Sequence, residues 1–272
     1  MDRRIRFGLL GCGAMGSTIA KSFDGGGILG DLKVVYDING AASSRLSKLL
    51  ESKPNVASDF SQLLDSCDFV IEAASQQAVF DHAAEVLNAG KDVLVMSVGA
   101  LMDRGLRDAV EDACRRAGSH VYLPSGAILG VDGLKAASVL GVEEVSLTTT
   151  KPPGALAGVK YLEDQGIDVK LFDKPTVVFE GGGVDAAKSF PQNINVAAIV
   201  ALSTGCDVKV TIIVDPNSER NVHEIVAKGR FGVIKTVAEN VPSPENPKTS
   251  YLAVLSAISV LRQVSGSVKI GN

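Results

Sequence analysis

The sequence predicts an α/β protein in two parts: an N-terminal Rossmann domain with a parallel sheet, and a second α+β domain with a mostly antiparallel sheet. First, short apolar stretches alternate with helical patterns up to residue 124, which is typical of parallel strands joined by helices. Second, β alternation dominates after Pro124. Third, a glycine-rich segment, residues 11–16, lies directly between the first strand and the first helix.

The N-terminal part reads as alternating strands and helices. Residues 5–10 are a short apolar run that stops at glycines, as a buried parallel strand does. Residues 76–88 carry apolar side chains at helical spacing, with Gly90 just past the end. The expected strands are 5–10, 33–36, 68–72, 92–96 and 120–123, and the expected helices are 14–23, 76–88 and 103–116.

The second part reads as a sheet interrupted by helices. Strands are expected at 144–151, 176–180, 207–214, 221–228 and 231–239, and helices at 128–138 and 194–202. A last helix is expected over 248–261, because Asn246-Pro247 is typical of a helix start. We therefore predict a first domain of residues 1–124, joined by the last helix within 246–264, and a second domain of residues 125–245.

Composition narrows the class of protein. Hydrophobic residues make up 46% and charged residues 21%, which is typical of a globular protein, and the net charge is -4 without a Lys/Arg-rich block. The lack of a Lys/Arg-rich block argues against nucleic acid as a partner. The sequence has no run of about 18 or more apolar residues, so no membrane span is expected. The four cysteines form no CxxC pair, so neither a zinc site nor a disulfide framework is expected. The basic start leads into the first strand, and a cytoplasmic protein with reduced thiols is expected.

The glycine-rich segment has the GxGxxG pattern, and it lies between a predicted strand and a predicted helix, as it does in dinucleotide-binding domains. Gly11 allows a tight turn, Gly13 lets a pyrophosphate approach the backbone, and Gly16 lets the helix pack close to the strand. Ala14 and Met15 then belong to the N-terminal turn of the helix, whose N–H groups attract phosphates. A glycine turn without a ligand is the alternative interpretation.

An acidic residue at the end of the second strand bears on cofactor preference. Asp37 lies 21 residues after Gly16, where a carboxylate can bind both hydroxyls of the adenosine ribose and repel a 2′-phosphate. This favours NAD over NADP. Arg45 is near enough in sequence to help bind a 2′-phosphate, so NADP stays possible.

More specific strings follow the GxGxxG segment along the chain. They are Glu72-Ala73-Ala74-Ser75-Gln76-Gln77-Ala78, Ser125-Gly126-Ala127, Phe190-Pro191-Gln192-Asn193-Ile194-Asn195-Val196-Ala197-Ala198, Asn221-Val222-His223-Glu224-Ile225 and Asn246-Pro247-Lys248-Thr249-Ser250-Tyr251-Leu252-Ala253. With the GxGxxG segment, these strings resemble the L-aspartate dehydrogenase family over about residues 5–264. The Pro-x-Asn-x-Asn-Val-Ala and Asn-x-His-Glu-Ile strings are the most specific ones.

The resemblance implies an activity, a cofactor and an assembly. It implies NAD(P)-dependent oxidation of L-aspartate to iminoaspartate, reversible as reductive amination of oxaloacetate, feeding NAD biosynthesis through quinolinate. It also implies that residues 1–124 are the dinucleotide-binding domain and that residues 125–245 are the substrate and dimerisation domain of a homodimer. The family's active-site histidine falls on His223 and its cofactor contacts fall on Ala127 and Asn193. Ala74 and Ser75, in the first string, are expected to contact the cofactor as well.

Only three histidines exist, and they differ in context. His82 lies at the edge of an apolar helical stripe and His120 opens a strand, so both are interpreted as structural. His223 lies in the second part, on a strand face shared with Ile225 and Ala227. A neutral imidazole that titrates near pH 7 suits general acid–base catalysis. Without the family resemblance, a structural strand histidine is an equally good interpretation.

Polar residues at two predicted helix starts are candidate ligands. Asn193 is expected to be an N-cap, a donor to the nicotinamide carboxamide or ribose, or both, and Asn195 is expected to bind substrate. Lys248, Thr249 and Ser250 would combine an ammonium, hydroxyls and free N–H groups into a carboxylate site, unless they only cap the helix. No metal site is expected, because the histidines and acids lack ligand spacing.

Two other functions stay open at this point. One is another two-domain NAD(P)-dependent reductase, of the semialdehyde or dihydrodipicolinate reductase type. The first type would need a nucleophilic cysteine in the second part, where only Cys206 lies, and the second type would show a His-His pair, which the sequence lacks. The other is a non-catalytic NAD-binding sensor, against which His223 and Asn193 argue.

Overall fold

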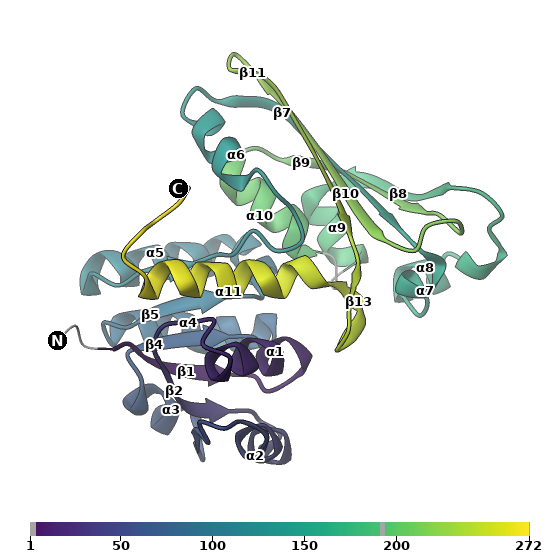
Figure 1. Ribbon diagram of the computed structural model, residues 1–272. Coiled ribbons are helices and arrows are strands. Elements are labelled where there is room, and N and C mark those ends of the chain that lie inside the picture. Colours follow the sequence, from purple (N-terminus) through teal and green to yellow (C-terminus); the bar gives the residue numbers. More distant parts are fainter. Residues whose placement is uncertain (1–3, 191–193, 272) are drawn as a thin grey trace. The chain divides into compact units, whose positions relative to one another are not determined.

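The computed structural model describes residues 4–190 and 194–271, with only the backbone of residues 247 and 248. The chain divides into two compact units (Figure 1). Unit 1 comprises Met1–Pro124 and Val254–Asn272, and unit 2 comprises Ser125–Ala253. No helix in the described part of the chain is long and apolar enough to cross a membrane.

Unit 1 is built on a six-stranded parallel sheet. Its strands are β1 (Arg6–Leu10), β2 (Asp31–Tyr36), β3 (Asn55–Val56), β4 (Phe69–Glu72), β5 (Asp92–Val95) and β6 (Val121–Tyr122). They lie in the order β3-β2-β1-β4-β5-β6. The strand order reverses between β1 and β4, where dinucleotide-binding sheets hold their ligand. The predicted Rossmann fold is therefore confirmed.

Helices connect these strands. They are α1 (Ala14–Asp24), α2 (Gly40–Leu49), α3 (Phe60–Ser66), α4 (Gln76–Asn88) and α5 (Arg104–Ala117), with a short 3-10 helix η1 (Val98–Met102). The C-terminal helix α11 (Tyr251–Ser265) connects no strands of this sheet, and its residues from Val254 on belong to unit 1. α4 buries the predicted stripe of Val79, Ala83, Val86 and Leu87. The Ser75 hydroxyl accepts a hydrogen bond from the Ala78 N–H at 3.2 Å and so caps this helix.

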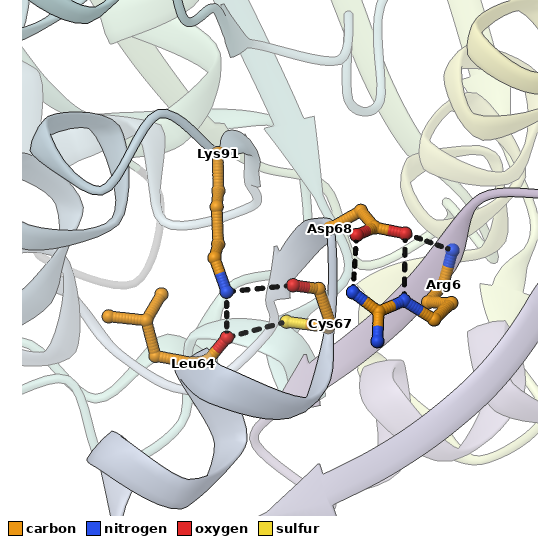
Figure 2. A network of polar contacts seen from close by, with 5 residues as sticks. All are labelled: Arg6, Leu64, Cys67, Asp68 and Lys91. Carbon is orange, nitrogen blue, oxygen red and sulfur yellow. Dashed lines mark hydrogen bonds and ion pairs between the residues drawn. The ribbon is translucent and has the colours of Figure 1, made fainter.

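A polar network fastens the amino ends of the strands in unit 1 (Figure 2). The Arg6 guanidinium donates to both carboxylate oxygens of Asp68, at 3.0 and 2.6 Å. The Lys91 ammonium donates to the carbonyl oxygens of Leu64 and Cys67, so it satisfies the backbone where α3 ends and β4 begins. This network belongs to the scaffold, because phosphates bind at the opposite, carboxyl ends of the strands.

Unit 2 is built on a mostly antiparallel five-stranded sheet. Its strands are β7 (Val142–Lys151), β8 (Thr176–Gly182), β9 (Val208–Val214), β10 (Asn221–Gly229) and β11 (Gly232–Asn240), in the order β11-β10-β7-β9-β8. The β7–β9 pair alone is parallel within this sheet. Figure 1 shows α6 (Val131–Ser138), α9 (Gly183–Ser189) and α10 (Ile194–Thr204) on one side of it. We call that side the inner face and the other side the outer face.

The inner face is apolar along most of its length. Alternate residues of the central strands point into it, as the period of two requires. They include Val145 and Leu147 from β7 and Ile225 and Ala227 from β10, each at most 2% exposed. The face that His223 was predicted to share with Ile225 and Ala227 is thus the buried one.

The sequence patterns missed several short elements. α2, α3 and β3 lie between the predicted second and third strands. Segment 151–174 folds into α7 (Pro153–Leu156), α8 (Lys160–Asp164) and a 3-10 turn, η2 (Val169–Leu171). α6 begins at Val131 and not at residue 128, because Gly130 precedes it in a left-handed conformation with φ 78°.

The prediction of a helix beginning at Lys248 is wrong. Residues Asn246–Ser250 form β13, which pairs antiparallel with β12 (Pro242–Ser243), and α11 starts at Tyr251. A residue that precedes proline avoids the helical region, so Asn246 enters an extended conformation that the β12 pairing then prolongs. Residues up to Ala253 consequently fall in unit 2.

Candidate functional site

The GxGxxG turn of unit 1 has the geometry of a phosphate cradle. Gly11 has φ +98°, and its N–H donates to the Tyr36 carbonyl at 2.8 Å. A Cβ on Gly11 would lie 2.6 Å from the Ala73 carbonyl oxygen, and one on Gly16 would lie 2.0 Å from the Gly11 carbonyl oxygen. Among the residues that the structure describes, apart from Gly13 and its two chain neighbours, no heavy atom lies within 4 Å of a Cβ built on Gly13. The turn is therefore tight on its inner side and open at Gly13.

The first turn of α1 is open to an anion. Gly13 is the N-cap residue, so no side chain caps this end, and the first turn contains no acidic residue. Ala14 and Met15 are partly exposed there. The N–H groups of this turn and the helix dipole together suit a pyrophosphate. These residues therefore fit the dinucleotide that the sequence predicts.

Asp37 is held in place beside the turn. Its carboxylate accepts hydrogen bonds from the Cys12 N–H at 2.7 Å and from the Asn39 N–H at 2.8 Å. Each carboxylate oxygen has a second lone pair, so both can still accept from a ribose diol. Burial and the Asp37 charge raise the pKa of the Cys12 thiol to about 12, which fits a small filler residue and not a nucleophile.

Glu72, at the carboxyl end of β4, organises two neighbouring loops. It is 2% exposed, and its carboxylate accepts from the N–H groups of Ala74 and Ser75 at 2.8 and 3.0 Å. Ser97 donates to it from its N–H at 3.0 Å and from its hydroxyl at 2.9 Å. Burial raises the pKa of Glu72, while these donors lower it, with burial prevailing. The N–H groups of the predicted cofactor contacts Ala74 and Ser75 are thus already used within the protein.

In unit 2, His223 lies on the inner face of the sheet. It is 5% exposed, and its Nδ1 shares a hydrogen bond of 3.0 Å with Thr149 Oγ1 across the β10–β7 ladder. This bond orients the ring and leaves Nε2 as the second ring nitrogen. Burial, and secondly the charge of Lys151, lower the pKa of His223 to about 3. The expectation that His223 titrates near neutral pH is therefore wrong for the ligand-free chain.

Lys151 is a buried lysine near His223 that the sequence analysis missed. It ends β7 on the inner face, two residues after Thr149, and is 6% exposed. Burial lowers the pKa of its ammonium group to about 8. The alternation of buried residues along 145–151 is the pattern that could have revealed it, because that alternation places Lys151 on the same face as Thr149.

The other predicted residues of unit 2 are dispersed. The Ala127 carbonyl accepts from Asn240 Nδ2 at 2.9 Å, and Ala127 is buried. Asn195 is exposed on α10, and Asn193 lies outside the described residues. Thr249 and Ser250 lie in β13, as does the backbone of Lys248, so the predicted helix N-terminus does not form around them. In the described residues no group of three or more His, Cys, Asp or Glu side chains could hold a metal ion.

Comparison with known proteins places this chain among dehydrogenases. A family model for the C-terminal domain of aspartate dehydrogenase matches residues 132–264, and one for the NAD-binding domain of homoserine dehydrogenase matches residues 11–124. The L-aspartate dehydrogenase of Methanosarcina acetivorans is 42% identical over 98% of this chain and 99% of its own length. That of Nitrosopumilus maritimus is 45% identical, with the same coverage.

The chain belongs to the L-aspartate dehydrogenase family. A crystal structure of aspartate dehydrogenase from Thermotoga maritima matches it with a TM-score of 0.76 and 28% identity, over 99% of this chain and 100% of that one. An aspartate semialdehyde dehydrogenase from Vibrio cholerae reaches a TM-score of 0.51 at 11% identity, which shows a shared fold alone. Membership of the L-aspartate dehydrogenase family thus disfavours the semialdehyde and dihydrodipicolinate reductase alternatives, and the NAD-binding match confirms the predicted cofactor.

Proposed function

We propose that the protein oxidises L-aspartate to iminoaspartate with NAD. The similarity to L-aspartate dehydrogenases over almost the whole length of both chains carries this proposal. It is supported by the open GxGxxG turn of unit 1 and by the buried His223–Thr149 pair of unit 2. A non-catalytic NAD sensor would have no use for an imidazole oriented at such a desolvation cost.

Each unit contributes a distinct part of the proposed chemistry. In unit 1, the backbone at Gly13, Ala14 and Met15 would hold the pyrophosphate, and Asp37 would hold the adenosine ribose. When bound, the dinucleotide supplies the acceptor of the substrate's Cα hydride. In unit 2, His223 Nε2 would hold the substrate and accept a proton, either from its amino group or from a water that attacks the imine. Thr149 would fix the ring for that task.

A substrate screen tests the proposal. Amino acids and 2-oxo acids with ammonia are offered together with NAD or NADP, and absorbance of the reduced nicotinamide is followed. We expect L-aspartate to be oxidised with a higher kcat/KM than L-alanine, and NAD to be preferred to NADP. His223→Ala should lower kcat by about a hundredfold or more, with the NAD dissociation constant unchanged. Near-normal turnover in a folded His223→Ala protein would return this histidine to a structural role.

We further propose a cytoplasmic homodimer that forms through the outer face of the sheet in unit 2. When helices cover only one face of a sheet, the uncovered face can be buried against a partner subunit. Apart from Glu224, the outer face displays uncharged side chains along its centre, among them Ser146, Thr148, Thr150, Thr211, Ile213, Val222 and Val226, with Val237 beside Glu224 on the edge strand β11. Two such faces, packed across a twofold axis, would bury them without pairing many charges.

The proposed product also suggests a place in metabolism. Iminoaspartate can be used in quinolinate synthesis, on the way to NAD, or it hydrolyses to oxaloacetate and ammonia. The same residues would serve the reverse reaction, because catalysis of a reversible reaction uses one transition state in both directions.

A further inference from the structure

The inner face of the sheet in unit 2 changes from apolar to polar at the amino end of β10. Asn221 and His223 precede Ile225 and Ala227 on this face, and all four residues are buried. Successive inward side chains on a strand lie about 7 Å apart, so Asn221 and His223 are immediate neighbours here. An amide and an imidazole therefore lie next to each other where the apolar core stops.

Asn221 has an acceptor that the fold leaves unused. Its Oδ1 is fully buried and accepts no hydrogen bond from any residue that the structure describes. The residue opposite it on β11 is Asn240, whose amide could have been the donor. Both hydrogens of that amide are used elsewhere, because Nδ2 donates to the carbonyl oxygens of Ala127 at 2.9 Å, Asn221 at 3.3 Å and Ala238 at 3.4 Å. A buried acceptor without a donor is costly, which fits a side chain whose partner is a bound ligand.

The unused oxygen selects the part of the substrate that it can bind. An oxygen acceptor needs an N–H or O–H donor, and at neutral pH both carboxylates of L-aspartate lack one. The amino group is therefore the only donor that L-aspartate offers. His223 has a pKa of about 3 and is neutral at pH 7. When its Nδ1 donates to Thr149 Oγ1, its Nε2 presents a lone pair to the same amino group.

We propose that Asn221 Oδ1 accepts a hydrogen bond from the amino group of the substrate and holds that group against His223 Nε2. This inference rests on the proposed function, because it assigns one part of L-aspartate to one side chain. A single nitrogen can bridge the two residues, since two hydrogen bonds of about 2.9 Å each span nearly the separation of neighbouring inward side chains. Oδ1 is closed to solvent in the ligand-free chain, so the side chains around it must move as the amino group enters.

An uncharged amide suits this position better than a carboxylate does. The amino group must lose a proton, which His223 Nε2 can accept, before the substrate's Cα gives up a hydride. An amide oxygen accepts a hydrogen bond from the ammonium and from the neutral amine alike. A carboxylate in its place would stabilise the ammonium and oppose the loss of the proton. Asn221→Asp should therefore keep the binding of L-aspartate and lose turnover.

Binding without turnover tests the inference. The full chain is saturated with NADH, which cannot accept a hydride, and the dissociation constants of L-aspartate and of succinate are measured calorimetrically. Succinate has the two carboxylates but no amino group. We expect Asn221→Leu to weaken L-aspartate binding about tenfold and to leave succinate binding nearly unchanged, because leucine has a similar shape and no acceptor. Asn217→Leu, at an exposed asparagine of the same unit, should leave both constants unchanged.

Turnover separates this role from a structural one. Asn221→Asp should bind L-aspartate at least as tightly as wild type, while its kcat falls about tenfold or more. A side chain that only supports the fold would not split binding from turnover in this way, so a wild-type kcat in Asn221→Asp would overturn the inference. So would an Asn221→Leu protein in which the dissociation constants of L-aspartate and succinate rise by the same factor, or in which neither rises. If Asn221→Leu does not fold, Asn221→Asp decides alone.

The outcome for Asn221 is separable from that of the proposed function. If wild type does not oxidise L-aspartate with NAD, the proposed function fails, whatever the dissociation constants are. If wild type oxidises L-aspartate while Asn221→Leu does not discriminate between L-aspartate and succinate binding, only the inference about Asn221 fails.

Discussion

At the scale of single residues, the Asp37 carboxylate should set the choice between NAD and NADP. Two backbone N–H groups hold it beside the GxGxxG turn, so its charge is fixed where a 2′-phosphate would lie. Asp37→Ser should weaken NAD binding and admit NADP, because the hydroxyl is a poorer partner for the ribose diol and repels no phosphate. The ratio of kcat/KM for the two cofactors measures this. Asp65→Ser, an exposed acid on α3, is the control. An unchanged ratio in Asp37→Ser would refute the role of Asp37.

At the scale of elements, Glu72 should fasten the β4–α4 loop to the loop that follows β5. Its two oxygens accept four hydrogen bonds from those loops. Glu72→Gln replaces one oxygen by an NH2 group, which cannot accept, so at least one donor is left unpaired. We expect the free energy of unfolding to fall by about 1–3 kcal/mol in urea titrations at pH 7.

The pKa of Glu72 adds a pH dependence to that comparison. Burial raises the pKa of Glu72 in the folded state above its pKa in the unfolded state. The contribution of Glu72 to the free energy of unfolding is therefore fully present below the unfolded-state pKa, and it is lost as pH rises through the folded-state pKa. Glu72→Gln should lack that dependence, whereas Glu111→Gln, on an exposed position of α5, should match wild type at every pH. Equal unfolding free energies for Glu72→Gln and wild type across the pH range would show that the two loops are held by other contacts.

At the scale of the whole molecule, the chain should be a dimer at micromolar concentration. Light scattering should give about twice the chain mass of 28.3 kDa. Val237 on the outer face of β11 is 50% exposed, so Val237→Arg should place two charges in the proposed interface and shift the protein toward monomer. Leu49→Arg, at an exposed apolar position of α2, should leave the mass unchanged. A monomeric wild type would exclude the proposed assembly.

The sequence by itself determined the elements that rest on local chemistry. Gly11, Gly13 and Gly16 between a strand and a helix already specify a phosphate-binding turn, because only glycine tolerates φ +98° at Gly11 and the 2.0 Å approach at Gly16. The helical period likewise defined α4 to its first and last residue.

Only the tertiary structure decided the start of α11 and the setting of His223. Residues 246–250 carry a good helix start, but pairing with β12 outweighs that local preference. The neighbours of His223 are Thr149 and Lys151, more than seventy positions earlier in the sequence and brought close by the β10–β7 pairing. Burial and a neighbouring charge set the pKa of His223, and both depend on strand register. A short stretch of sequence therefore cannot predict the pKa of about 3 that His223 has in the fold.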